Sequence, residues 1–161
     1  MLRNILTQLL VFFLIFQAVS FLRETTMLSI STTIVDKVIQ LPTLMGKNIK
    51  VHSVGKKTVI YFFAPWCQTC HASISNLQSL YENNEHIDVI AVAMDYKTIA
   101  EVSQFNQQHQ LTFPIALGNE EIKKYFKITG YPSYYILDEQ NTIIGRSLGY
   151  SSELGLYLRS L

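Results

Sequence analysis

The first apolar stretch of the chain is an unbroken run close to its N-terminus. Residues 5–22 carry no charge, and 18 residues in a helix extend about 27 Å, close to the ~30 Å hydrocarbon layer of a membrane. No polar face recurs at the helical period, so a buried amphipathic core helix is a poor alternative. The pattern predicts that residues 1–22 are a membrane anchor or a secretion signal.

The residues that flank this run indicate on which side of the membrane the rest of the chain lies. Arg3 precedes the run, whereas Arg23 is followed at once by Glu24, so the positive charge is biased toward the N-terminal side. Both interpretations of the run therefore predict export. Residues 18–20 (AVS) fit a signal-peptidase site, but the apolar run continues beyond them, which favours an uncleaved anchor.

The remaining chain is long enough for one domain with one hydrophobic core. Residues 23–38 show no strong pattern and are expected to be a linker, which leaves residues 39–161 for the domain. Within it, residues 42–51 (PTLMGKNIKV) place a Gly-Lys-Asn triplet between two short apolar stretches. This arrangement predicts an N-terminal hairpin ahead of the core.

A buried strand and a helix are predicted to meet in the middle of the sequence. Residues 59–63 (VIYFF) form a short apolar run rich in β-branched and aromatic side chains, which is typical of a strand covered on both faces. Apolar residues then recur at helical spacing, at Ile74, Leu77, Leu80 and Tyr81. The intervening residues 64–71 (APWCQTCH) are therefore expected at the N-terminus of a helix.

Strands and helices continue to alternate after this junction. Residues 89–94 (VIAVAM) predict a second buried strand, and Thr98 with Glu101 suggests a capping box for a following helix. Asn119 is expected to cap a short helix, residues 133–137 and 142–147 to pair as antiparallel strands, and apolar positions at Leu154, Tyr157, Leu158 and Leu161 to define a closing helix. The order predicts an α/β fold in which helices flank a central mixed sheet.

Charge and cysteine content narrow the function. Lysine and arginine total 13 against 12 aspartate and glutamate, without a run of one sign, so no nucleic-acid partner is expected. The only two cysteines, Cys67 and Cys70, lie three residues apart, a spacing too short for the usual structural disulfide. This spacing is typical of a redox dithiol or half of a metal site.

The expected position of these cysteines favours redox chemistry. A thiolate is the form that attacks disulfides, and the positive end of a helix dipole stabilises it. Cys67 is therefore the predicted nucleophile, and Cys70 is close enough to attack the mixed disulfide formed on Cys67. Gln68 and Thr69 lie between them, where side chains tune the redox potential, although neither is ionisable.

Residues 59–70 (VIYFFAPWCQTC), with residues 130–133 (GYPS) some sixty positions later, resemble thioredoxin-like proteins. The exported, anchored form resembles the TlpA/ResA/DsbE branch of membrane-anchored thiol-disulfide oxidoreductases. Residues 149–161 also resemble the copper-tolerance-associated members. The resemblance implies a thioredoxin fold with a helix inserted after the second buried strand, preceded by one transmembrane helix.

The same resemblance implies a site and its partners. The peptide bond between Tyr131 and Pro132 is expected to be cis, with the neighbouring backbone pairing with an extended substrate strand. Apart from the resemblance, Trp66 has two open interpretations: a simple hydrophobic cover, or a flat apolar surface beside a reactive cysteine that helps dock the substrate. No cofactor is implied beyond the redox-active Cys67–Cys70 disulfide. Exported thiol or disulfide proteins are the implied substrates, with the reductase direction favoured and a DsbD-type or DsbB-type membrane protein as redox partner. The implied location is the bacterial inner membrane, in a single pass, with the catalytic domain in the periplasm or extracytoplasmic space.

The sequence departs from the family pattern at three positions. Tyr61 occupies the place where many members have an acid beneath the dithiol, and Ser73 the place where some branch members have a glutamate. The proton acceptor for Cys70 is therefore unassigned. Thr69 stands where thioredoxins usually have proline, so a strongly reducing potential does not follow from the resemblance.

Other functions compete for the same residues. Cys67, Cys70 and His71 form a complete Cys-x-x-Cys-His, the attachment motif of c-type haem, and could also bind copper or zinc. These alternatives leave the preceding strand, Trp66 and Tyr131-Pro132 without a role, and a metal site would want a further ligand. A structural interaction module with a vestigial dithiol is a third hypothesis, whereas a thiol peroxidase does not require a vicinal pair.

Overall fold

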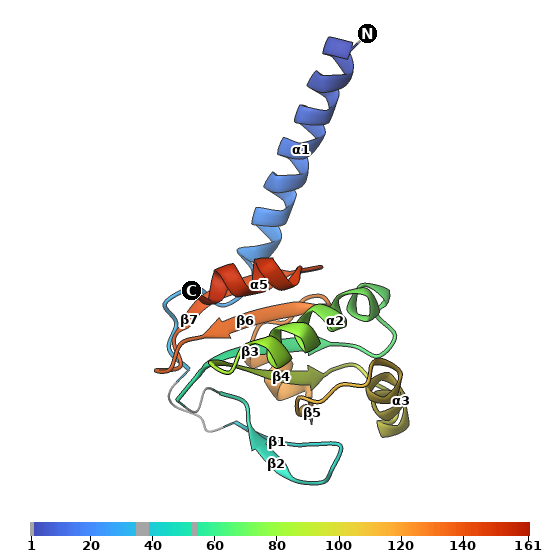
Figure 1. Cartoon of the computed structure of the whole chain (residues 1–161), viewed down its shortest axis with the longest axis vertical. Coiled ribbons are helices and arrows are strands. Elements are labelled where there is room, and N and C mark those ends of the chain that lie inside the picture. The colour runs from blue at the N-terminus through green and yellow to red at the C-terminus, as the bar shows by residue number, and fades with distance from the viewer. Residues whose placement is uncertain (1, 35–38, 53–54) are drawn as a thin grey trace.

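The computed structural model describes residues 2–34, 39–52 and 55–161; the side chains of residues 2–4, 16–17 and 20–23 lie outside the described part. The elements alternate as the sequence predicts (Figure 1). In chain order they are α1 (Leu2–Glu24), β1 (Gln40–Pro42), β2 (Asn48–Lys50), β3 (Lys57–Phe63), α2 (Gln68–Asn83), β4 (Ile87–Ala93), α3 (Ile99–His109), β5 (Ile115–Leu117), α4 (Glu120–Tyr125), β6 (Ser133–Leu137), β7 (Ile143–Leu148) and α5 (Glu153–Ser160).

Five strands form the central sheet in the order β5-β4-β3-β6-β7. β3 and β5 run parallel to β4, whereas β6 is antiparallel to both β3 and β7. The expected mixed sheet flanked by helices is thus confirmed. β3 is central and almost fully buried, which explains why it reads as a continuous apolar run rather than an alternating one.

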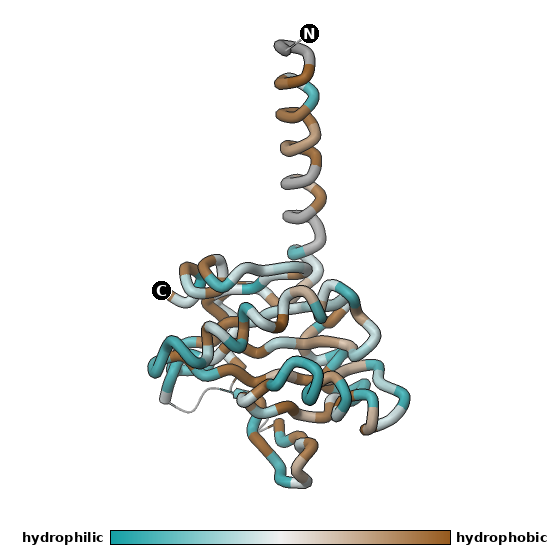
Figure 2. The backbone as a smooth tube through the Cα atoms, turned by 45° about the vertical axis from the view of Figure 1, so that its right-hand side comes forward, coloured by the Kyte–Doolittle hydropathy of each residue, from teal (hydrophilic) through white to brown (hydrophobic). Residues whose placement is uncertain are grey.

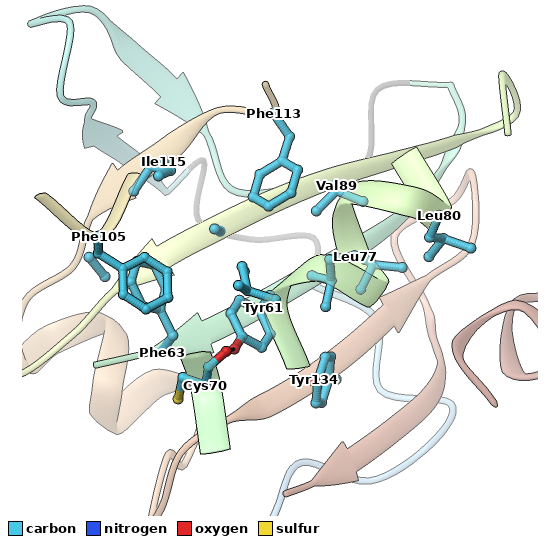
Figure 3. Packing of buried hydrophobic residues seen from close by; sticks show 14 of the residues in the cluster. Tyr61, Phe63, Cys70, Leu77, Leu80, Val89, Phe105, Phe113, Ile115 and Tyr134 are labelled. Carbon is cyan, nitrogen blue, oxygen red and sulfur yellow. Dashed lines mark hydrogen bonds between the residues drawn. The ribbon is translucent and has the colours of Figure 1, made fainter. Parts of the chain in front are cut away.

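Each face of the sheet has its own hydrophobic cluster. On one face, side chains such as Val59, Tyr61 and Phe63 pack against α2, α3 and α5 (Figure 3). On the other face, Ile60 and Phe62 pack against α4 and the chain segments that precede the sheet. Alternate residues of β3 therefore pack into the two hydrophobic clusters, one on each face of the sheet. The burial of both sets fixes the register of β3.

The strand β5 was not expected from the sequence. It has only three residues, and it pairs with β4 from Ala91 to Ala93. A glycine is required just after it, because a Cβ at Gly118 would lie 2.8 Å from the Ala93 carbonyl oxygen. The Gly118 amide instead donates to that oxygen at 2.8 Å, which holds the carboxyl ends of β4 and β5 together.

The expected hairpin is present as β1 and β2, which pair antiparallel. Its turn contains Gly46 at a φ of +75°, a left-handed conformation that glycine adopts without strain. Thr43 forms a bridge with Ala116 of β5, so the hairpin lies against this edge of the sheet.

Part of the segment expected to be a linker packs onto the domain. Met27 and Ile34 are buried, and Thr33 forms a bridge with Thr142 at the start of β7. Arg146 of β7 donates from Nη1 to the carbonyl oxygen of Leu28 at 2.7 Å. Residues 27–34 therefore form a strap over the sheet; residues 35–38 of the expected linker lie outside the described part.

The helix α1 extends away from the body of the molecule, and its coloured residues are largely apolar (Figures 1 and 2). Described side chains along it are exposed, including Leu6, Leu9 and Phe12, the last at 70%. Within the part of the chain that the structure describes, none of the helices is both long enough and apolar enough to cross a membrane.

Candidate active site

Cys67 is the N-cap residue of α2, directly after the loop that leaves β3. Its backbone is extended, and its Sγ accepts a hydrogen bond from the Cys70 amide at 3.1 Å. The Cys70 amide thus donates both to this sulfur and to the Cys67 carbonyl oxygen, the latter at 3.0 Å, and the sulfur lies at the positive end of the dipole of a 16-residue helix. The same environment stabilises a thiolate at Cys67.

Cys67 and Cys70 form a disulfide, with their Cα atoms 5.2 Å apart. The two cysteines differ in access, since Cys67 is 6% exposed and Cys70 is 0% exposed. Of the two, Cys67 is thus the one that retains some contact with solvent. Gln68 and Thr69 are exposed on the first turn of α2, beside the disulfide.

Hydroxyl groups, rather than a carboxylate, lie beneath the dithiol. The Tyr61 hydroxyl points toward Cys70 and donates to its carbonyl oxygen at 3.4 Å, and it lies 3.3 Å from the Ser73 hydroxyl (Figure 3). Burial raises the pKa of Tyr61 well above its usual value, and burial also raises the pKa of Tyr134 to about 12. Both phenols stay protonated near neutral pH, so neither can serve as an anionic base for Cys70.

The loop that carries Tyr131 and Pro132 lies at the same edge of the sheet as the dithiol. Ser133 is paired with Phe62, so the residues just before β6 are next to the end of β3 from which the dithiol follows. The Tyr131–Pro132 peptide bond is cis, as the resemblance implies. Pro132 is buried, and the Tyr131 ring meets the Trp66 ring edge to face, with centroids 6.0 Å apart.

The sequence missed two residues that contact these aromatic side chains. Asp95 follows β4, and its carboxylate accepts from the Tyr131 hydroxyl at 3.0 Å and from Lys123 Nζ at 2.6 Å. Its main-chain carbonyl accepts from Trp66 Nε1 at 3.0 Å. The sequence signal that could have identified Asp95 was its position just after a buried strand. The carboxyl ends of the parallel strands β3 and β4 meet at one edge of the sheet, where the dithiol also lies.

His71 forms a histidine pair that sequence reasoning did not detect. Its Nε2 lies 2.8 Å from the Pro65 carbonyl oxygen, which can only accept, so Nε2 carries the proton. In the neutral ring Nδ1 is then the acceptor, and Nε2 of His109 donates to it at 2.7 Å. Burial and the neighbouring His71 lower the pKa of His109.

The hydrogen bonds of His71 affect the alternative hypotheses in which Cys67, Cys70 and His71 bind a metal ion or haem. Both His71 ring nitrogens are engaged, so a ligand role for His71 would break at least one hydrogen bond. Among the described residues, no group of three or more histidine, cysteine, aspartate or glutamate side chains could hold a metal ion. The arrangement of Cys67 and Cys70 is suited to exchanging two electrons with another dithiol.

Comparison with known proteins identifies the class of this chain. A family model described as the AhpC/TSA family matches residues 34–146. This match covers more than half of the sequence, so the chain belongs to the AhpC/TSA family.

Individual relatives agree with the resemblance that the motifs indicated. The sporulation thiol-disulfide oxidoreductase A of Bacillus subtilis is 28% identical over 120 residues, which cover 71% of this chain and 73% of that protein. The thioredoxin-like protein YneN of the same species is 33% identical over 109 residues, covering 64% of this chain and 63% of YneN. This chain thus spans less than two thirds of the length of YneN.

Solved structures support the fold. The crystal structure of StoA from Bacillus subtilis matches with a TM-score of 0.70 at 25% identity, covering 79% of this chain and 98% of the other. A thiol:disulfide interchange protein DsbE from Chlorobium tepidum, itself described as putative, matches in fold with a TM-score of 0.70 at 20% identity, covering 82% and 95%. The predicted thioredoxin fold and the thioredoxin-like relationship are confirmed.

Proposed function

We propose that this protein is a thiol-disulfide oxidoreductase whose reactive groups are Cys67 and Cys70. The observation that carries the proposal is a disulfide between Cys67, which keeps slight exposure at a helix N-terminus, and the fully buried Cys70. Relatives named as thiol-disulfide oxidoreductases support the same reaction.

The reaction consists of two exchange steps. In the reducing direction, the Cys67 thiolate attacks a substrate disulfide, so a Cys67–substrate S–S bond forms and one substrate sulfur leaves as a thiolate that takes up a proton. The Cys70 thiolate then attacks Cys67 Sγ, which forms the internal disulfide and releases the second substrate sulfur. Two electrons pass from the protein dithiol to the substrate, and oxidation of a substrate is the reverse.

The burial of Cys70 supports this division of roles. A substrate disulfide can approach Cys67, whereas Cys70 becomes the attacking group only after a mixed disulfide has formed next to it. We assign substrate contacts to Trp66, Tyr131 and Pro132, because the two aromatic rings meet at the edge of the sheet where the dithiol lies. Gln68 and Thr69 are assigned to tuning the redox potential.

The proposed setting is the outer face of a bacterial inner membrane. The uncharged run at residues 5–22, taken over its whole length and so including the positions of α1 outside the described part, supports a single-pass anchor. The exposed apolar side chains of α1 also support it. Exported proteins are then the substrates, and a membrane protein of the DsbD or DsbB type exchanges electrons with the dithiol. Recovery of the full chain in a washed membrane fraction is expected; release of the full-length chain by salt alone would contradict the anchor.

The experiment that tests the proposal is a titration of the purified chain against glutathione or dithiothreitol buffers. A reversible two-electron couple is expected, which Cys67→Ser and Cys70→Ser each abolish. We propose the reductase direction, for which the potential should lie near or below about −250 mV, whereas a value above about −180 mV would favour a disulfide donor. A chain without a reversible couple would refute the function.

A further inference from the structure

Asp95 contacts two aromatic side chains of the proposed substrate site, Trp66 and Tyr131, and each of the three residues lies on a different loop. Trp66 belongs to the loop between β3 and α2, and Tyr131 to the loop between α4 and β6. Asp95, in the loop between β4 and α3, contacts both side chains. We propose that Asp95 is a positioning residue that fixes Trp66 and Tyr131 relative to the dithiol and thereby sets the fit of extended protein substrates; this rests on the proposed function.

Two different groups of Asp95 make these contacts. The main-chain carbonyl accepts from Trp66 Nε1 at 3.0 Å, while the carboxylate accepts from the Tyr131 hydroxyl at 3.0 Å. The backbone turns sharply here, with a φ of +46°, a left-handed conformation that aspartate tolerates better than most residues. Because of this turn, Asp95 directs its main-chain carbonyl toward Trp66 and its carboxylate toward Tyr131.

The ammonium group of Lys123 holds the Asp95 carboxylate in place. Lys123 of α4 donates to both carboxylate oxygens, at 2.8 and 2.6 Å, and its Nζ lies 5.9 Å from the centroid of the Tyr131 ring. The lysine and aspartate side chains are 27% and 31% exposed, so water screens this pair only in part. Charge-assisted hydrogen bonds have stricter geometry than neutral ones, which makes the carboxylate a fixed support for Tyr131.

The arrangement leaves Trp66 accessible while restricting its motion. The side chain is 60% exposed, and its edge contact with Tyr131 and its hydrogen bond to Asp95 hold it. A side chain that is both exposed and fixed is suited to binding a partner, because less rotamer freedom is lost when the partner docks. Loosening either contact should therefore weaken binding rather than the bond exchange itself.

The test uses two changes at Asp95 in the full chain, held in a mild detergent. Asp95→Gly removes the carboxylate and tolerates the left-handed backbone, whereas Asp95→Asn keeps an acceptor for Tyr131 but loses the charge that pairs with Lys123. Asp88→Ala is the matched control, since Asp88 lies near the start of β4, at the end of the strand opposite Asp95, and pairs with Lys56 at 3.8 Å on the surface.

Kinetics with two substrates separate positioning from chemistry. For a disulfide-bonded peptide, we expect Asp95→Gly to raise KM by about three- to tenfold with kcat nearly unchanged, and Asp95→Asn to have a smaller effect. The rate with 2-hydroxyethyl disulfide, which is too small to contact both aromatic rings, should not change. Equal KM values for Asp95→Gly and Asp88→Ala would overturn the proposal.

The fluorescence of Trp66 gives an independent readout, because it is the only tryptophan in the chain. Asp95→Gly keeps the main-chain acceptor of Trp66 but frees Tyr131, whose ring packs against Trp66. Collisional quenching by acrylamide should therefore increase in Asp95→Gly and stay at the wild-type level in Asp88→Ala. Unchanged quenching in Asp95→Gly would overturn the positioning role. If the wild-type chain exchanges no disulfides, the proposed function fails, and the quenching comparison still decides whether Asp95 fixes Trp66.

Discussion

The Sγ atom of Cys67 is both the proposed nucleophile and the acceptor of the N-cap hydrogen bond of α2. Serine can replace it as a cap, whereas alanine cannot. In the reduced state, we expect Cys67→Ala to have a free energy of unfolding about 1 kcal/mol lower than Cys67→Ser, while both lack exchange activity. Urea unfolding under dithiothreitol measures the difference. Equal stabilities would show that the sulfur does not cap the helix.

His109 should make stability depend on pH. Its pKa is lowered from the usual 6.5, so the folded chain binds fewer protons at this ring than the unfolded chain does at mildly acidic pH. The stabilisation is complete above about pH 6.5 and is lost as pH falls through the lowered pKa. His109→Gln keeps a donor for His71 but does not titrate, so its urea midpoint should fall less between about pH 7.5 and about pH 5.5. His86→Gln, at an exposed site, is the control and should behave as the wild type.

Sequence reasoning found the residues that a local pattern marks and missed those that only folding brings together. Cys67, Cys70, Trp66 and Pro132 stand in recognisable motifs. By contrast, His71 and His109 are 38 positions apart, and nothing in either neighbourhood predicts their 2.7 Å hydrogen bond. Asp95 likewise ends an apolar run without any spacing that points to Tyr131.

At the scale of the element, the close approach of β4 and β5 depends on Gly118. A methyl group there would lie 2.8 Å from the Ala93 carbonyl oxygen and 2.9 Å from Val92 Cγ1, so the backbone would have to shift. We expect Gly118→Ala to lower the free energy of unfolding by about 1–3 kcal/mol. Gly130→Ala, where the nearest atom is Leu148 Cδ1 at 3.4 Å, should cost much less. Similar urea midpoints for the two variants would contradict this account.

Elements were predictable in proportion to their length and periodicity. β3 and β4 have seven residues each and are nearly all buried, so their apolar runs are visible in the sequence. β5 has three residues, directly after a proline, which is too short for a pattern to emerge. The cap at Thr98 was readable because its side chain and Glu101 stand at a fixed spacing, and the structure has the hydrogen bond from the Glu101 amide to Thr98.

At the scale of the whole molecule, the strap of residues 27–34, which follows α1, packs against the edge of the sheet formed by β7. Met27 is 3% exposed within the cluster on that face, so Met27→Ala should lower the free energy of unfolding by about 2 kcal/mol or more. Met45→Ala is a matched control, because Met45 is 89% exposed and its truncation should change stability by less than about 0.5 kcal/mol. Thermal or urea unfolding of both variants tests the role of the strap.

The strap escaped prediction for a physical reason. Within the strap only Met27 and Ile34 are deeply buried, whereas the apolar Leu28 is half-buried and Ile30 is exposed, so burial follows no strand or helix period that the sequence could reveal. The backbone pairs instead through hydrogen bonds such as Ile143 N to Thr32 O at 2.9 Å. Contacts of this kind depend on the sheet being already assembled.

Together with the hairpin, the strap covers part of each margin of the sheet. Thr43 bridges β5 on one margin, and Thr33 bridges the start of β7 on the other. Exposed strand edges invite other chains to add on, which leads to aggregation. The two bridges therefore shorten the stretches of strand edge that this molecule presents to an unpaired strand of another chain.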